Sequence, residues 1–175
     1  MMNAKALRPL WSVIMSDLRS ALTFAICDEL DSALSRIAHC VNQLSDEQVW
    51  WRPRADMNSI ANLMLHLTGN VRQIFVSSIG GEADIRDRQA EFDTRKPLPK
   101  AELLGALTDT VTRAKAAFAA ASADELCRMR QVNKFDWTGM QAAVRCAAHF
   151  RGHTQEIIHL TREILGEKYQ FAGPR

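Results

Sequence analysis

The sequence predicts an all-α protein built as a helical bundle. Four long stretches carry apolar residues at helical spacing, and capping residues, glycines or prolines separate them. No stretch shows the alternating apolar and polar pattern of a half-buried strand. Long amphipathic helices bury their apolar faces against one another, so we expect them to pack around one shared core.

Length and composition are those of one globular domain. The chain has 175 residues, of which 47% are hydrophobic and 24% are charged, and it is long enough to bury a substantial core. We expect residues 1–175 to form a single domain, with 1–17 as an N-terminal extension that lacks the features of a signal peptide. The four cysteines show no C-x-x-C spacing, which favours reduced thiols and a cytoplasmic location.

Charge and hydropathy argue against two classes of partner. The formal net charge is only +2, so no strong long-range field attracts nucleic acid or an anionic membrane. No apolar run approaches the roughly 18 residues needed to cross a bilayer. We therefore expect a small-molecule substrate, and neither nucleic acid nor a membrane, as the partner.

The first two predicted helices cover residues 17–44 and 59–79. Both have apolar residues on one face, and the apolar face of the second is the wider. Ser59 can cap the second helix, and Gly80 follows its last predicted residue. In the connection between the helices, Pro53 prevents either helix from continuing.

Residues 80–99 differ in composition from the stretches on either side. Charged residues crowd into this segment, which ends with Pro97-Leu98-Pro99. It is too long for a tight turn between packed helices, so we expect it to cross the bundle or to cover one end. It is either a solvated loop or a lid that offers Arg86 or Arg88 to an anionic substrate.

Two further helices are predicted at residues 100–121 and 138–165. The first ends in a run of alanines, which favours helix and permits close approach of a neighbouring helix. The second ends at Gly166. Residues 127–137, between the two helices, are expected to be irregular.

Three histidines on the second and fourth predicted helices are candidate metal ligands. His149 and His153 are four residues apart, so both rings can face one point beside the helix. His66 lies in the middle of the second helix, where a facing helix can supply a third ligand. Three protein ligands leave a position for water, hydroxide or a substrate thiolate, as in catalytic metal sites. The alternative is a chance pair of histidines in solvent.

Imidazole ligands do not by themselves select one ion. Zinc, nickel, copper and iron(II) all bind imidazole. We expect a divalent ion, with zinc or nickel first and iron or manganese as alternatives.

Polar residues accompany these histidines at helical spacing. Metal-bound imidazoles need acceptors for their outer N–H groups, and the expected partners are Asn62, Asn70 and Arg145. Glu156 can be such an acceptor, an extra ligand or a catalytic general base. Gly152, inside a helix at some cost in stability, indicates close backbone packing or an approaching ligand.

Three motifs of the sequence resemble the DinB-like superfamily, and in particular a subfamily of uncharacterised proteins within it. They are Leu44-Ser45-x-Glu47-Gln48-x-Trp50-Trp51-Arg52-Pro53, Asn58-Ser59-Ile60-Ala61-Asn62-Leu63-x-Leu65-His66-Leu67-x-Gly69-Asn70 and His149-x-x-Gly152-His153-x-x-Glu156-Ile157. The resemblance runs from about Leu18 to Gly166. It implies an up-up-down-down four-helix bundle, often a homodimer, with a metal held by His66, His149 and His153.

The resemblance also implies an activity. Characterised relatives include S-transferases and isomerases that use bacillithiol or mycothiol with zinc or a similar ion, and others are grouped as metal-dependent hydrolases. The preferred hypothesis is therefore an enzyme that activates a low-molecular-weight thiol or a water molecule. The rival is a stress-related binding or scaffold bundle without turnover, in which the metal is structural. A coordination position open to a pocket favours catalysis, and a closed one favours the scaffold.

Overall fold

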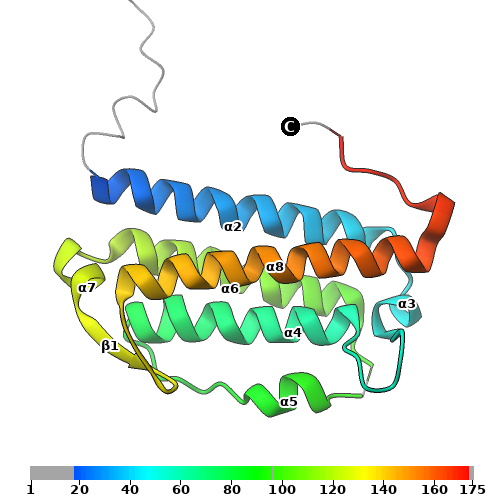
Figure 1. The fold of residues 1–175 in the computed structure, drawn as a ribbon, viewed down its shortest axis with the longest axis horizontal. Helices are drawn as coiled ribbons and strands as arrows, with labels where there is room; N and C mark the ends of the chain where they lie inside the picture. The colour runs from blue at the N-terminus through cyan, green and yellow to red at the C-terminus, as the bar shows by residue number, and fades with distance from the viewer. Residues whose placement is uncertain (1–17, 96, 174–175) are drawn as a thin grey trace, which may run out of the picture.

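The computed structural model describes residues 18–95 and 97–173, and the expected N-terminal extension, 1–17, lies outside them. Most of the described chain is helical, which confirms the helical expectation. Four long segments lie side by side (Figure 1): α2 (Leu18–Asn42), α4 (Ile60–Val71) continued by η1 (Arg72–Ile79), α6 (Lys100–Ala120) and α8 (Gly139–Leu165). In the described residues, none of the helices combines the length and apolarity that crossing a bilayer requires.

Local hydrogen bonds begin and shape these helices. The side chain of Ser59 accepts from the backbone of Asn62 at the start of α4, and Thr138 forms a capping box with Gln141 at the start of α8. The second predicted helix keeps its span, but its last part, η1, has the wider π-helical turn. Short helices lie in the connections between the long segments: α3 (Asp46–Trp50), α5 (Arg88–Asp93) and α7 (Ala123–Cys127). A further short helix, η2 (Gly166–Lys168), follows α8.

Contacts at the helix ends fix the direction of each long segment. Lys100 Nζ donates to the carbonyl of Val41 over 3.3 Å, so α6 begins beside the end of α2. A Cβ added at Gly80 would lie 3.1 Å from that of Ala117, so η1 and α6 end together. Beyond the end of α8, the Gln170 carbonyl accepts from Gln43 Nε2 over 3.1 Å, at the end of α2.

The directions of the second and fourth segments correct the expected order. The segments run up-down-down-up, and the expectation of up-up-down-down is wrong. The short connection from α2 through α3 reverses the chain into α4. By contrast, segment 80–99 runs back along the molecule to the end at which α4 begins (Figure 1). Helix α6 starts at that end too, so α4 and α6 run parallel.

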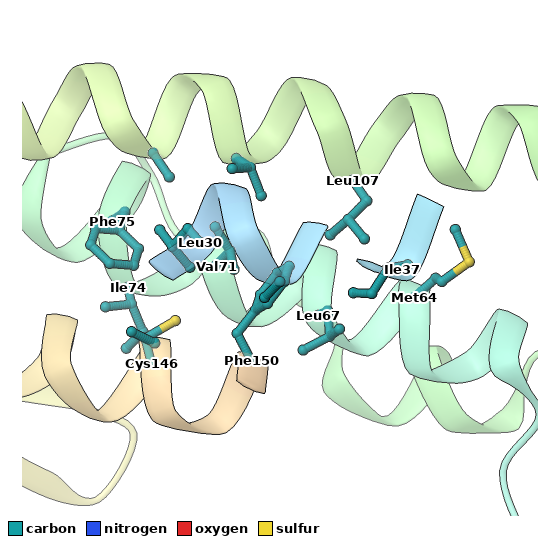
Figure 2. Close-up of a cluster of buried hydrophobic side chains, with 14 of the residues drawn as sticks. Leu30, Ile37, Met64, Leu67, Val71, Ile74, Phe75, Leu107, Cys146 and Phe150 are labelled. Carbon is teal, nitrogen blue, oxygen red and sulfur yellow. The ribbon is translucent and has the colours of Figure 1, made fainter. Parts of the chain in front are cut away.

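The core lies between the four long segments (Figure 2). Large apolar side chains from each of them are almost completely buried, and each contributes about 1.5–3 kcal/mol relative to exposure. The rings of Phe75 and Phe118 pack edge to face with centroids 5.3 Å apart. Other buried members, drawn in Figure 2, are Leu30, Ile37, Met64, Leu67, Leu107 and Phe150.

A β-hairpin occupies the stretch expected to be irregular, so the expectation of no strand is wrong here. Strands β1 (Met129–Val132) and β2 (Phe135–Thr138) pair antiparallel, and Asn133 in their turn has φ 55°. The strands are only four residues long, and β1 is fully buried only at its last residue. The pattern that marks a half-buried strand is therefore missing from the sequence.

All four cysteines are free thiols, as expected. Cys40 and Cys146 are buried, and Cys127 is exposed. Burial raises the pKa of Cys146 to about 12, so its thiol stays protonated at neutral pH and behaves as a small apolar group.

Candidate metal centre

The three predicted histidines come together between α4 and α8. The ring nitrogens that can bind an ion all lie within 4.8 Å of one another. Nε2 of His66 and Nε2 of His149 are 2.8 Å apart, and two ring nitrogens this close share either a hydrogen or an ion. On α8, the four-residue spacing places the rings of His149 and His153 4.5 Å apart between centroids. The antiparallel α4 supplies the third ring.

Helix α5 holds the ring of His66 on the side opposite the cluster. Nδ1 of His66 lies 2.9 Å from Oε2 of Glu91. The ring of Phe92, the next residue, packs against the imidazole with centroids 4.7 Å apart. A carboxylate can only accept, so Nδ1 carries the hydrogen and Nε2 faces the cluster with its lone pair. Metal-binding histidines are commonly oriented by such a carboxylate.

Arg86 keeps Glu91 ionised although the carboxylate is buried. Its Nε donates to Oε1 over 2.7 Å and its Nη2 donates to Oε2 over 2.8 Å. Burial alone would raise the pKa of Glu91, but the hydrogen bonds from Arg86 and His66 outweigh burial and hold that pKa below its usual value. Nη2 of Arg86 also lies 3.2 Å from Nδ1 of His66, because two donors share one carboxylate oxygen.

Gly69 leaves the space that this carboxylate occupies. A Cβ at position 69 would lie 1.9 Å from Oε1 of Glu91 and 3.1 Å from Nε of Arg86. Any side chain there would push α5 away from α4. The sequence analysis missed Glu91 and Gly69. The available signal was a glycine one turn after His66 on the same helix face, followed by a segment rich in charged residues of both signs.

Glu156 takes a similar place beside His153. Its Oε2 lies 2.8 Å from Nδ1 of His153, one turn earlier on α8, which leaves Nε2 of that histidine for the cluster. Of the three roles considered for Glu156, this contact is the one expected of an acceptor for an outer N–H group. Its role as a catalytic base stays a prediction.

The remaining predicted partners lie close to the cluster but contact other groups. Asn62 is buried, and its Nδ2 donates to the backbone carbonyl of Glu91 over 2.9 Å, so it secures α5. Asn70 accepts from the thiol of Cys146 over 3.2 Å. The guanidinium of Arg145 lies over the ring of Trp137, 5.0 Å from its centroid.

The two other histidines of the chain lie outside the cluster. His39 contacts the carbonyl of Gln170 through Nε2 at 2.6 Å, and His159 is exposed. The expectation of close packing at Gly152 is wrong, because a Cβ there would meet open space.

The electrostatics of the cluster favour a neutral His149. Its ring faces two other imidazoles and the guanidinium groups of the crossing segment. Desolvation and then the charges of His153 and His66 lower the pKa of His149 to about 4. At neutral pH its nitrogen lone pair is therefore available to an ion without loss of a proton.

The donor set and its spacing fit a divalent ion. Zinc–nitrogen bonds measure about 2.0–2.1 Å, so two ligands of one ion lie at most about 4.2 Å apart. The widest pair in the cluster exceeds this separation by at most about 0.6 Å, which small ring rotations remove. The three-histidine cluster can therefore hold a divalent ion.

A cavity of about 310 Å³ opens beside the cluster. The rings of His66 and His149 form part of its wall. The hairpin and α8 add Trp137 and Arg145, and the crossing segment adds Arg88. A small molecule in this cavity would contact two of the three candidate ligands.

Comparisons with known proteins agree with this fold. The family described as "Protein of unknown function (DUF1572)" matches residues 22–173. A conserved protein from Enterococcus faecalis has 16% identity and a TM-score of 0.66, and the match covers 82% of this chain and 97% of that one. A DinB-like protein, YjoA, from Bacillus subtilis has 14% identity and a TM-score of 0.64, over 86% of this chain and 99% of that one.

Identities this low show a shared fold and nothing about activity. No curated protein matched the chain. The family match covers most of the sequence, and the structural neighbours place the fold. The chain belongs to the DUF1572 family, and its fold is that of a DinB-like protein.

Proposed function

We propose that this protein is a metal-dependent enzyme with the DinB-like four-helix-bundle fold, in which His66, His149 and His153 hold one divalent ion. The observation that carries the proposal is the convergence of three imidazoles beside a cavity. Two of the three, His66 and His153, already have their outer nitrogens on carboxylates. A chance cluster of histidines has no need of such partners.

The residues of the chain prepare this site in three ways. Glu91 and Glu156 fix the tautomers of His66 and His153, so that both present Nε2 to the ion. His149 is neutral at pH 7 and needs no proton to leave before it binds. The side chain of Glu156 is 42% exposed, so it can exchange protons with solvent, and we assign it the role of general base.

A bound divalent ion would lower the pKa of a coordinated water or thiol and so supply a nucleophile at neutral pH. The proposed reaction is therefore transfer of a low-molecular-weight thiol or hydrolysis of a small molecule. Zinc or nickel is the proposed ion, with iron or manganese as alternatives. We also propose a cytoplasmic homodimer, with the whole chain as one domain.

Metal analysis of purified protein tests the first step. We expect one ion per chain by mass spectrometry in the unaltered protein, and less than about a tenth of that in His149→Ala. His159→Ala is the matched control, because His159 is an exposed histidine on the same helix outside the cluster. Equal metal content in His149→Ala and the control would overturn the ligand assignment.

Turnover distinguishes an enzyme from a scaffold. The loaded protein is assayed for loss of a thiol in the presence of a model electrophile and for hydrolysis of an activated ester. The enzyme proposal requires a rate that chelation removes and that His149→Ala lacks. Stoichiometric metal without turnover in either assay, combined with a metal-dependent gain in stability, favours the scaffold alternative.

A further inference from the structure

The cavity beside the histidines has a strongly cationic wall. Three arginines line it: Arg86 and Arg88 from the crossing segment, and Arg145 from α8. Within the described part of the chain, no aspartate or glutamate belongs to its lining. A net charge of +2 for the whole chain does not predict such a local concentration of one sign.

Arg86 is not available to a ligand. Its guanidinium makes two hydrogen bonds to Glu91 and donates to Gln73 Oε1 over 2.9 Å, so its charge is neutralised and its donors are mostly used. The lid interpretation of the sequence placed Arg86 and Arg88 on equal terms. The structure separates them: both line the cavity, but the guanidinium of Arg86 is bound to Glu91, whereas that of Arg88 is not.

Arg88 and Arg145 are held in a different way. The guanidinium of Arg88 lies 4.9 Å from the centroid of Phe92, and that of Arg145 lies 5.0 Å from the centroid of Trp137. Among residues 18–95 and 97–173, neither has a carboxylate within ion-pair distance. Stacking on a ring limits the motion of a guanidinium while leaving its edge donors and its positive charge available.

The same ring that supports Arg88 also packs on His66. Phe92 contacts both, and its centroid lies 4.7 Å from that of the imidazole. One aromatic side chain therefore sets the separation between a candidate metal ligand and a cation of the cavity. A group bound by Arg88 would lie at a defined position relative to the histidine cluster.

From this arrangement we propose that the cavity binds a small organic anion with an apolar body, through Arg88 and Arg145. Guanidinium groups match the geometry of carboxylate and phosphate oxygens. Ile74, Ala142 and Trp137 supply the apolar part of the lining. A volume of about 310 Å³ admits one small molecule and excludes a large one. The claim that this anion is a substrate rests on the proposed function. The claim that the cavity binds an anion does not.

Fluorine NMR on the metal-free, full-length protein tests anion binding directly. The four tryptophans are replaced biosynthetically by 5-fluorotryptophan, and the Trp137 signal is assigned with Trp137→Phe. The probes are benzoate, phenyl phosphate and the neutral isostere benzamide. We expect a saturable shift of the Trp137 signal with at least one of the two anions, and no saturable shift with benzamide. The stronger of the two anions identifies which oxyanion the cavity prefers.

Variants connect the shift to the two arginines. Arg88→Gln and Arg145→Gln should each raise the Kd for the preferred anion about tenfold, because each removes a charged donor. Arg162→Gln is the matched control: Arg162 lies on α8 and stacks on Phe171 at 5.4 Å, but does not line the cavity. It should leave the Kd unchanged.

Three outcomes would overturn the inference. They are no saturable shift with either anion, an equal shift with benzamide, and an unchanged Kd in both Arg88→Gln and Arg145→Gln. Metal content is measured separately on the same preparations. Stoichiometric metal in a protein that binds neither anion would leave the proposed function intact and remove this inference alone.

Discussion

Oε2 of Glu91 lies 2.9 Å from Nδ1 of His66, although 25 residues separate the two in the chain. Segment 80–99 makes this contact by crossing α4 and placing the short helix α5 over His66. The carboxylate is buried and held by Arg86, so it is a fixed acceptor. The candidate metal centre therefore depends on a connection between helices as much as on the helices themselves.

Replacing that acceptor should weaken metal binding without unfolding the protein. Glu91→Gln keeps the size of the side chain but loses the charge, so its hold on the His66 tautomer weakens. We expect zinc affinity to fall about 10- to 100-fold, which is the usual effect of removing a hydrogen-bond partner of a metal-binding histidine. Competition with a chromophoric chelator measures it. Glu82→Gln is the control, because Glu82 is an exposed carboxylate of the same segment, paired with Arg113. Equal affinities in the two variants would contradict the role of Glu91.

Two glycine substitutions should change stability in opposite directions. Gly69→Ala places a methyl group where Glu91 lies, so we expect a loss of about 1–3 kcal/mol in the free energy of unfolding. Gly152→Ala meets open space inside α8 and should gain about 0.5–1 kcal/mol. Urea unfolding followed by circular dichroism measures both. A stabilised Gly69→Ala would mean that α5 does not pack on α4 as described.

Metal should stabilise the folded protein through the cluster. An ion that binds only the native state at 100 times its Kd adds about 2.7 kcal/mol. We expect Tm to rise with zinc in the unaltered protein and in His159→Ala, and to stay unchanged in His149→Ala. Thermal unfolding with added zinc and with EDTA measures the difference. The same rise in His149→Ala would place the ion elsewhere.

Thiol reactivity should follow burial. The pKa of Cys146 is raised to about 12, so its reactive thiolate is rare at pH 8 and becomes common only near pH 12 or after unfolding. Cys127 is exposed and should react at pH 8 with iodoacetamide. We expect alkylation of Cys146 to be at least about 100 times slower, measured by peptide mass spectrometry. Comparable native-state rates at the two sites would show that Cys146 is not buried.

The long helices were predictable because each has a continuous apolar face. The expected ranges 59–79 and 138–165 agree closely with the observed Ile60–Ile79 and Gly139–Leu165. Periodicity does not report direction, so the order up-up-down-down came only from the resemblance to the DinB-like superfamily, and it was wrong. The hairpin was missed because four-residue strands with little burial are stabilised by pairing and not by a sequence pattern.

The site was predictable in part. The four-residue spacing of His149 and His153 and the polar row around His66 indicated a cluster, and the structure brings the three together. Nothing local links His66 to Glu91, because this contact arises only when segments 25 residues apart pack together. Asn62 was expected at an imidazole, but it holds the backbone of α5.

The crossing segment, residues 80–99, combines two roles. Within six residues it carries Glu91, which orients His66, and Arg88, which charges the cavity. It contributes little to the core, most of which the four long segments supply. Exchange of this segment between homologous chains would therefore change both the metal affinity of the histidine cluster and the anion specificity of the cavity, while the helical core stays the same.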